Sequence, residues 1–246
     1  MAELRAVKDG DEIERLRAAG LAADRVVQSI AAGRLAGRSE AEVAHEVRDR
    51  LVDEGHDEAA FAIVASGPNS ASPHHAPGDR RIIANGDASM AGEAIVLDIG
   101  GVRQGYCSDT TRTIWVTGER GSPDPDFLAR YAVLQRAQAE ATMAVRPGIE
   151  CQAIDAAARS VITEAGYGDR FIHRTGHGIG LEVHEDPYIV AGNAEPLQVG
   201  HAFSIEPGIY VDGRDGARIE DIVVCGVNGA DAMNRSSRDL YVVTGA

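Results

Sequence analysis

The sequence predicts an α+β domain in which helices cover one side of a curved, mainly antiparallel sheet and leave the other face open. Two amphipathic helices followed by strands occur twice, approximately over residues 9–118 and 122–228. Residues 92–100 and 200–208 also share one pattern: a glycine, an apolar run, a carboxylate and a second glycine. Such an internal repeat organises a fold around a pseudo-two-fold axis. Because each half alone would leave its sheet half covered, we expect residues 1–246 to form one domain.

Two helices are predicted at the start of the first half. Over residues 9–32, apolar side chains recur at steps of three and four, which is typical of an amphipathic helix. Asp9 is followed three residues later by a glutamate, as in a capping box. Ser39 opens the second helix with the same spacing, and Gly55 closes it.

Strands complete the first half. An apolar run over residues 60–65 predicts a strand, and a loop rich in Gly, Pro and Ser follows over residues 66–78. Residues 94–100 and 111–116 predict a strand pair, with Gly105 at the bend between them.

The second half repeats this order. The predicted elements are a helix from Pro123 to the Pro147-Gly148 pair, a helix over residues 149–165, a histidine-rich stretch over residues 173–184, and strands over residues 202–205 and 219–224.

Composition excludes several classes of protein. The net charge of −14 disfavours nucleic-acid binding, which requires a basic patch. The three cysteines have no CxxC spacing, so neither a disulfide framework nor a thiolate zinc site is expected. Residues 1–10 lack the apolar core of a signal peptide, and no apolar run reaches membrane-spanning length. We therefore expect a cytoplasmic protein with no membrane partner.

Four carboxylates occupy matching places in the two halves. Asp98 and Glu206 follow the repeated apolar runs, and Asp109 and Glu220 each stand in the next apolar stretch. The symmetry would bring all four together from buried strands. Buried carboxylates repel one another and do not stay ionised without positive charge nearby. The pattern therefore predicts two divalent cations at this place.

One histidine fits the same site. His177 stands in a Gly-His-Gly-Ile-Gly segment, where the glycines permit close backbone approach. An imidazole with four carboxylates, and no thiolate, suits Mn²⁺ best, with Co²⁺, Fe²⁺ or Zn²⁺ as alternatives.

With these residues in view, the sequence resembles the pita-bread metallopeptidases, the group that contains prolidase, aminopeptidase P and methionine aminopeptidase. The resemblance covers essentially the whole chain and implies the pita-bread fold. Five residues match the group's ligands for two metal ions in type and order: Asp98, Asp109, His177, Glu206 and Glu220. It implies that Asp98 binds one ion, that His177 and Glu206 bind the other, and that the remaining two carboxylates bridge both.

Two segments are most similar to the prolidase and aminopeptidase P branch, namely residues 66–75 and 173–185. By that resemblance His74, His173 and His184 line the substrate pocket. We expect His74 and His184 to be catalytic, and either to donate hydrogen bonds to the developing oxyanion or to hold the substrate carbonyl.

The remaining candidates are an arginine and four histidines. Arg218 lies two residues before Glu220, and either holds a bridging carboxylate or the carboxylate of the peptide, or forms a surface ion pair. His75 is left undecided. Three histidines are interpreted as structural: His45, His56 and His201.

The expected activity is hydrolysis of the peptide bond between an N-terminal residue and proline, with a peptide or dipeptide as the partner. Two metals would activate a water and polarise the scissile carbonyl, and Glu206 would carry its proton to the leaving nitrogen. Two alternatives stay open: a methionine aminopeptidase-like enzyme, and a metal-free peptide-binding module on the same fold. A homodimer is also compatible with the sequence.

Overall fold

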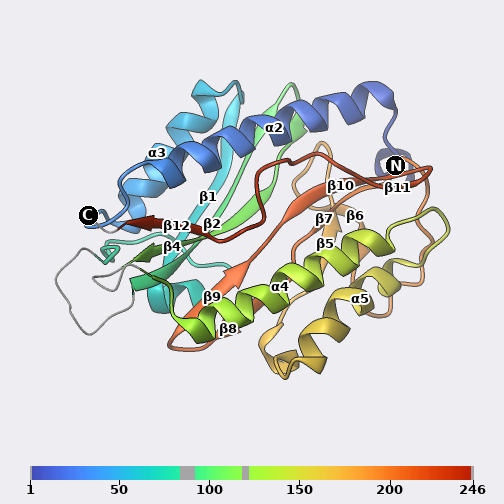
Figure 1. The fold of residues 1–246 in the computed structure, drawn as a ribbon. Coiled ribbons are helices and arrows are strands. Elements are labelled where there is room, and N and C mark those ends of the chain that lie inside the picture. Colours follow the sequence, from blue (N-terminus) through green and yellow to red (C-terminus); the bar gives the residue numbers. More distant parts are fainter. Residues whose placement is uncertain (1, 84–91, 118–121, 245–246) are drawn as a thin grey trace.

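The computed structural model describes residues 2–83, 92–117 and 122–244. Two pairs of long helices lie against strands, and in Figure 1 α2 and α4 pass in front of them. The helices are α1 Ala2–Ala6, α2 Gly10–Ala32, α3 Glu40–Asp53, α4 Pro125–Ala144 and α5 Cys151–Glu164, with short 3-10 helices η1 Gly67–Ala71 and η2 Gly168–Arg170.

The strands form two five-stranded sheets and one ribbon. They are β1 Glu58–Ser66, β2 Gly92–Arg103, β3 Tyr106–Cys107, β4 Thr110–Thr117, β5 Gly176–Gly178, β6 Glu185–Ile189, β7 Ala202–Ile205, β8 Gly208–Val211, β9 Asp215–Arg218, β10 Asp221–Gly226, β11 Gly229–Ala232 and β12 Tyr241–Thr244. One sheet has the order β1-β2-β4-β12 with β3 beside β2, the other has the order β11-β10-β7-β5-β6, and β8 pairs with β9. All these pairs are antiparallel except β12 with β4. The predicted α+β, mainly antiparallel architecture is confirmed.

Local sequence explains where the helices begin. Asp9 accepts a hydrogen bond from the backbone of Glu12 and donates its own N–H to that side chain, which completes the predicted capping box. Ser39 caps α3 in the same way. The predicted start of α4 at Pro123 is two residues early. Asp124 caps this helix, and Pro125 takes the first helical position, where a missing N–H costs nothing.

The backbone reproduces the internal repeat. Gly37 and Gly148 occupy equivalent places before α3 and α5, with φ of 79° and 83°. Gly55 and Gly166 end the same two helices, with φ of 97° and 86°. Only glycine adopts such left-handed conformations without strain, so the turns themselves are duplicated. The predicted end of the first repeat, residue 118, lies outside the described residues.

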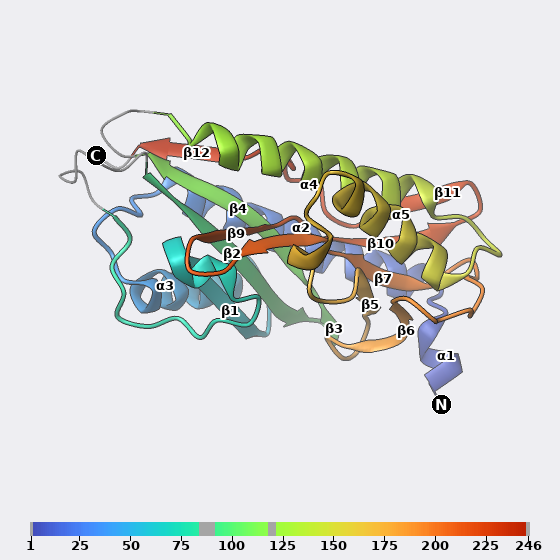
Figure 2. The same ribbon diagram turned by 90° about the horizontal axis from the view of Figure 1, so that it is seen from below.

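The two helix pairs pack mainly on different sheets, and Leu16 of α2 also joins Ile222 of β10 in a smaller core. Buried residues of α2 and α3, such as Val27 and Val47, contact Leu97 of β2 in one apolar core. Leu134 of α4 and Phe203 of β7 belong to a second core. Alternate residues of a strand point to opposite faces, so the face of β2 away from α2 is left for other contacts. Viewed from below, α4 and α5 again lie to one side of the strands (Figure 2).

The two sheets meet at the middle of the molecule. Thr111, at the start of β4, forms an isolated bridge with Glu220, just before β10. The backbone N–H of Glu220 donates to the Thr111 carbonyl at 3.1 Å. This bridge joins the two halves next to the matching carboxylates Asp109 and Glu220 and fixes them relative to each other.

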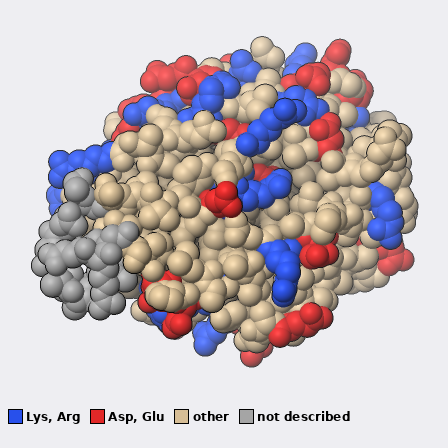
Figure 3. Space-filling model, viewed as in Figure 1, with Lys and Arg blue, Asp and Glu red and all other residues tan. Residues whose placement is uncertain are grey.

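Two features of the described residues bear on the predicted partners, namely the distribution of charge on one face and the apolar character of the helices. On the face drawn in Figure 3, basic side chains are scattered among acidic ones and form no continuous basic stripe. Among residues 2–83, 92–117 and 122–244, no helix combines the length and apolar character needed to cross a bilayer.

Candidate active site

A pocket of about 760 Å³ gathers the predicted functional residues. It opens on the face of the sheets opposite the long helices. All nine side chains singled out from the sequence line it: His74, Asp98, Asp109, His173, His177, His184, Glu206, Arg218 and Glu220. Its remaining walls are mainly apolar and include Phe61, Val183 and Tyr188.

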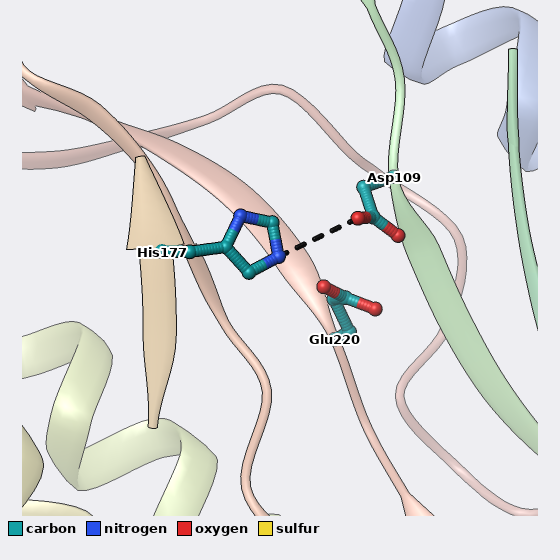
Figure 4. Close-up of side chains that lie close together, drawn as sticks. All are labelled: Asp109, His177 and Glu220. Atoms are coloured by element: carbon teal, nitrogen blue, oxygen red, sulfur yellow. Dashed lines mark ion pairs between the residues drawn. The ribbon is translucent and has the colours of Figure 1, made fainter. Parts of the chain in front are cut away.

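Three buried ligand-type residues converge at the floor of the pocket. Asp109 precedes β4, His177 lies in β5 and Glu220 precedes β10, so both sheets contribute. Their nitrogen and oxygen atoms lie within 4.8 Å of one another (Figure 4). The His177 Nε2 is 3.6 Å from the nearer Asp109 oxygen.

The other two predicted carboxylates flank this cluster. Glu206 Oε1 lies 3.3 Å from His177 Nε2 and accepts a hydrogen bond from the Ser204 hydroxyl at 3.1 Å. On the opposite side, Asp98 Oδ2 accepts from Arg218 at 2.6 Å. The second oxygen of Asp98 is buried and has no hydrogen-bond partner in the structure.

Burial and mutual repulsion favour protonation of these carboxyls. Burial, reinforced by the neighbouring carboxylates, raises the pKa of Asp109 and of Glu220 well above the usual range. Burial raises the pKa of Glu206 to about 7. Burial lowers the pKa of His177 to about 3, so its ring is neutral near pH 7. Arg218 opposes these shifts but does not cancel them, so further positive charge would favour the ionised carboxylates.

The orientation of His177 shows what would complete the site. Its Nδ1 lies 3.0 Å from the Gly178 carbonyl oxygen, so Nδ1 carries the proton and donates. The lone pair of Nε2 therefore faces carboxyl oxygens of Asp109 and Glu206, an arrangement that is stabilised either by a proton on a carboxyl or by a metal ion bound between them. The Asp98 oxygen that has no hydrogen-bond partner is a further atom able to coordinate a metal ion. These residues fit divalent metal ions, and the oxygen-rich set matches hard or borderline metals.

Arg218 is buried at the pocket wall, which rules out the surface ion pair. Its guanidinium binds Asp98 and also donates to the Tyr210 hydroxyl at 2.9 Å and to the Pro73 carbonyl at 3.3 Å. It therefore orients one carboxylate and anchors the loop next to His74. The carboxylate that it binds is Asp98, whereas the sequence prediction was a bridging carboxylate.

The pocket histidines differ in how many of their ring nitrogens are hydrogen-bonded and in how exposed they are. His173 has both ring nitrogens engaged, Nδ1 with the Arg174 carbonyl at 2.7 Å and Nε2 with Tyr210 at 2.9 Å. Burial lowers the pKa of His173 to about 3. His184 is exposed at the pocket edge, with its ring centroid 4.2 Å from that of His177. His74 is likewise exposed, so these two rings are accessible to a ligand.

The other histidines do not line the pocket. His75 lies 2.7 Å from the buried Glu40 carboxylate, which also binds the Ser66 backbone. His56 is buried, with Nδ1 at the Leu51 carbonyl and Nε2 at the Ser108 hydroxyl. His201 is buried beside the β7 backbone, and His45 is exposed on α3.

Three side chains of the site were missed by sequence reasoning. Tyr210 links His173 to Arg218, and Ser204 links the His177 backbone to Glu206. Ser204 lies in the repeated segment of residues 200–208 but has Val96 at the equivalent position of the first half, and Tyr210 lies just after that segment. The repeat therefore offered no signal for either side chain.

Arg174 is the third. Its guanidinium lies 5.1 Å from the centre of the Tyr188 ring, and its buried Nε has no hydrogen-bond partner. Among the described residues that line the pocket, Arg174 is a cation without a carboxylate within ion-pair distance. The signal was present, since Arg174 stands between His173 and the glycine-rich segment of His177, but a lone arginine in a loop is usually solvated.

Comparisons with known proteins agree with this geometry. Residues 14–226 match the model of metallopeptidase family M24. The chain is 51% identical over 241 residues to the probable dipeptidase PepE of Mycobacterium tuberculosis, covering 98% of this chain and 61% of that protein. It is 39% identical over 239 residues to an Xaa-Pro dipeptidase of Pyrococcus furiosus, covering 97% and 66%.

Solved structures give the same result. The crystal structure of dipeptidase PepE from Mycobacterium ulcerans superposes with a TM-score of 0.92 at 51% identity, covering 98% of this chain and 62% of that one. The chain therefore spans about three fifths of the length of these mycobacterial relatives.

Proposed function

Because the chain belongs to metallopeptidase family M24, we propose that it hydrolyses the peptide bond between an N-terminal residue and a following proline. We further propose that residues 1–246 act as a single catalytic domain. One observation carries the metal-dependent part of the proposal most strongly: the neutral His177 directs the lone pair of Nε2 at carboxylate oxygens of Asp109 and Glu206. The similarity to an Xaa-Pro dipeptidase supports the substrate class.

Two divalent ions, most consistent with Mn²⁺, would be held by the five acceptor residues. We assign Asp98 to one ion, His177 and Glu206 to the other, and Asp109 and Glu220 to both. The support is that all five line one pocket and that three of them already have ligand atoms within 4.8 Å of one another. When bound, such ions supply an activated water and polarise the scissile carbonyl.

Glu206 is the residue best suited to move a proton. Its side chain is 15% exposed and lines the pocket, so a carboxylate oxygen is accessible to a water bound there. Ser204 donates to one of its oxygens and so fixes the direction of the carboxylate. Glu206 would accept the proton of the attacking water and deliver it to the leaving nitrogen.

His74 and His184 would act as hydrogen-bond donors to the carbonyl oxygen as negative charge develops there. Both are exposed to the pocket, whereas His173 is fully engaged with protein partners. His173 therefore orients Tyr210, and Tyr210 with Asp98 holds Arg218 in place. Donors aimed at developing charge stabilise the transition state more than the substrate.

The charge distribution in the pocket suggests which way a peptide lies. The carboxylate cluster favours the free α-ammonium of an N-terminal residue, whereas Arg174 offers positive charge to a carboxylate. We propose that Arg174 binds the C-terminal carboxylate of a dipeptide. The apolar walls Phe61, Val183 and Tyr188 would contact the proline ring, whose tertiary amide has no N–H to leave unpaired.

The experiment is a comparison of three peptides under identical conditions with Mn²⁺. Ala-Pro and Met-Pro should be cleaved, and Met-Ala-Ser should be cleaved more slowly. Preferential cleavage of Met-Ala-Ser would establish the methionine aminopeptidase-like alternative. Binding of Ala-Pro without any cleavage, in a chain that takes up no metal, would establish the peptide-binding alternative.

The cysteines bear on the cellular location that we propose. Cys107, Cys151 and Cys225 are free and buried. Free thiols support the proposal of a reducing, cytoplasmic location.

A further inference from the structure

A buried lysine lies behind the loop that carries His184. The Nζ of Lys8 is 3.7 Å from Oε2 of Glu185, and the two side chains are only 1% and 7% exposed. The backbone of Lys8 is fixed as well, because its N–H donates to the Gly200 carbonyl at 2.9 Å. Buried lysine is rare unless it is paired, so this ion pair is a built feature of the fold.

Glu185 closes the loop on itself. Its Oε1 accepts from the Glu182 backbone at 3.0 Å and from Arg5 at 3.1 Å. A Cβ at Gly180 would lie 2.7 Å from the same Glu185 oxygen and 3.0 Å from Lys8 Cε. The glycine therefore makes room for the ion pair, and the pair ties both ends of residues 180–185 together.

The two neighbours Glu185 and His184 face opposite ways. His184 lines the pocket, whereas the Glu185 carboxylate points to the N-terminal segment that carries Lys8. This alternation is expected where the loop enters β6. The position of the His184 ring thus depends on a carboxylate that is held from behind.

We propose that the Lys8–Glu185 ion pair is a positioning pair that holds His184 toward the reacting peptide. The inference rests on the proposed function of His184. If the ion pair has this role, the segment of residues 5–8, which precedes the first long helix, contributes to the geometry of the active site. The rival explanation is that the ion pair contributes only to the stability of the fold.

A double-mutant design separates the two explanations. Lys8→Met leaves Oε2 of the buried Glu185 without its cation, while Arg5 still pairs with Oε1 at 3.1 Å. We expect it to lower kcat/KM on Ala-Pro by about tenfold, the lower end for groups that orient active-site residues. In a His184→Ala background, the same substitution should change kcat/KM by less than about twofold, because its route of action is gone. An equal loss in both backgrounds would overturn the proposal.

A variant without either charge serves as the control for effects on stability. Replacement of a buried ion pair by apolar side chains commonly preserves stability, so Lys8→Met combined with Glu185→Met should melt near the unsubstituted protein. Its kcat/KM should nevertheless stay low, with metal content unchanged, whereas Lys8→Arg should retain activity. Recovery of activity together with stability in the double variant would show a purely structural pair. Arg25→Met, which removes an exposed ion pair with Glu54, is the matched control.

A readout independent of activity distinguishes this inference from the proposed function. In protein labelled at histidine nitrogen, Lys8→Met should shift the His184 ring resonance and leave that of the exposed His45 in place. An unmoved His184 resonance would overturn the inference. A shifted resonance in a protein that cleaves no Xaa-Pro peptide would instead overturn the proposed function.

Discussion

Replacing Glu206 with glutamine should remove a pH-dependent loss of stability from the metal-free protein. Burial raises the pKa of Glu206 from 4.5 to about 7. Between these two values, the folded chain keeps a proton that the unfolded chain has released. The free energy of unfolding therefore falls as the pH rises through this window, and the contribution of Glu206 is complete only below about 4.5.

The size of the effect follows from that shift. Each pKa unit corresponds to about 1.4 kcal/mol, so a rise of roughly two and a half units corresponds to about 3 kcal/mol. For a chain of this length, 1 kcal/mol moves Tm by about 2–4 °C, and the expected loss between pH 4.5 and pH 8 is about 6–12 °C. A glutamine at position 206 has no proton to lose, so its metal-free Tm should fall less by this amount.

Thermal unfolding of chelator-treated protein at a series of pH values measures this difference. Glu164→Gln, at an exposed position on α5, is the control and should behave like the unsubstituted protein. Adding Mn²⁺ at pH 8 should restore Tm of the unsubstituted protein, because metal binding requires ionised ligands. Parallel pH profiles for Glu206→Gln and the unsubstituted protein would refute the reasoning.

Three further predictions concern ligands, donors and substrate charge. Asp109→Asn and Glu220→Gln should each lose bound metal and lower kcat/KM by more than about tenfold. Metal analysis alongside kcat/KM measures both effects, and full metal occupancy in either variant would contradict the prediction. His74→Ala should lower kcat/KM by about 10²–10³ with metal content intact, and His75→Ala should cost less, since its ring pairs with a buried glutamate; equal losses would make the choice of histidine wrong. Arg174→Gln should reduce the preference for Ala-Pro over its C-terminal amide by about 10–100-fold, and an unchanged preference would exclude carboxylate binding.

An exposed arginine provides the control for the last of these. Arg146 lies outside the pocket and donates to a nearby backbone carbonyl. Arg146→Gln should leave both the rate on Ala-Pro and the preference over its amide unchanged. A comparable loss in this variant would trace the effect to overall charge.

Much of the fold could be predicted because the sequence contains an internal repeat, so each element is indicated in both halves. The capping boxes at Asp9 and Ser39 involve only residues three apart, so local sequence determines them. The helix that follows Asp124 was placed too early because two prolines stand close together and only the cap distinguishes them. The pairing of β12 with β4 was not anticipated, since residues far apart in the chain make a parallel pair.

The acidic part of the site was predictable for the same reason. A carboxylate in a buried strand is unfavourable alone, and its repetition in the second half identifies it as functional. Arg174, Ser204 and Tyr210 could not be selected, because each acts through contacts made only in the folded chain. The role of Arg218 was open from the sequence and was narrowed by its burial against Asp98.

Metal reconstitution tests the central claim most directly. Protein stripped by a chelator should show no hydrolysis of Ala-Pro, and stepwise addition of Mn²⁺ should restore activity as occupancy rises to two ions per chain. The same titration of Glu220→Gln should fall short of that occupancy. Full activity on Ala-Pro in protein that elemental analysis shows to be free of metal would contradict the account.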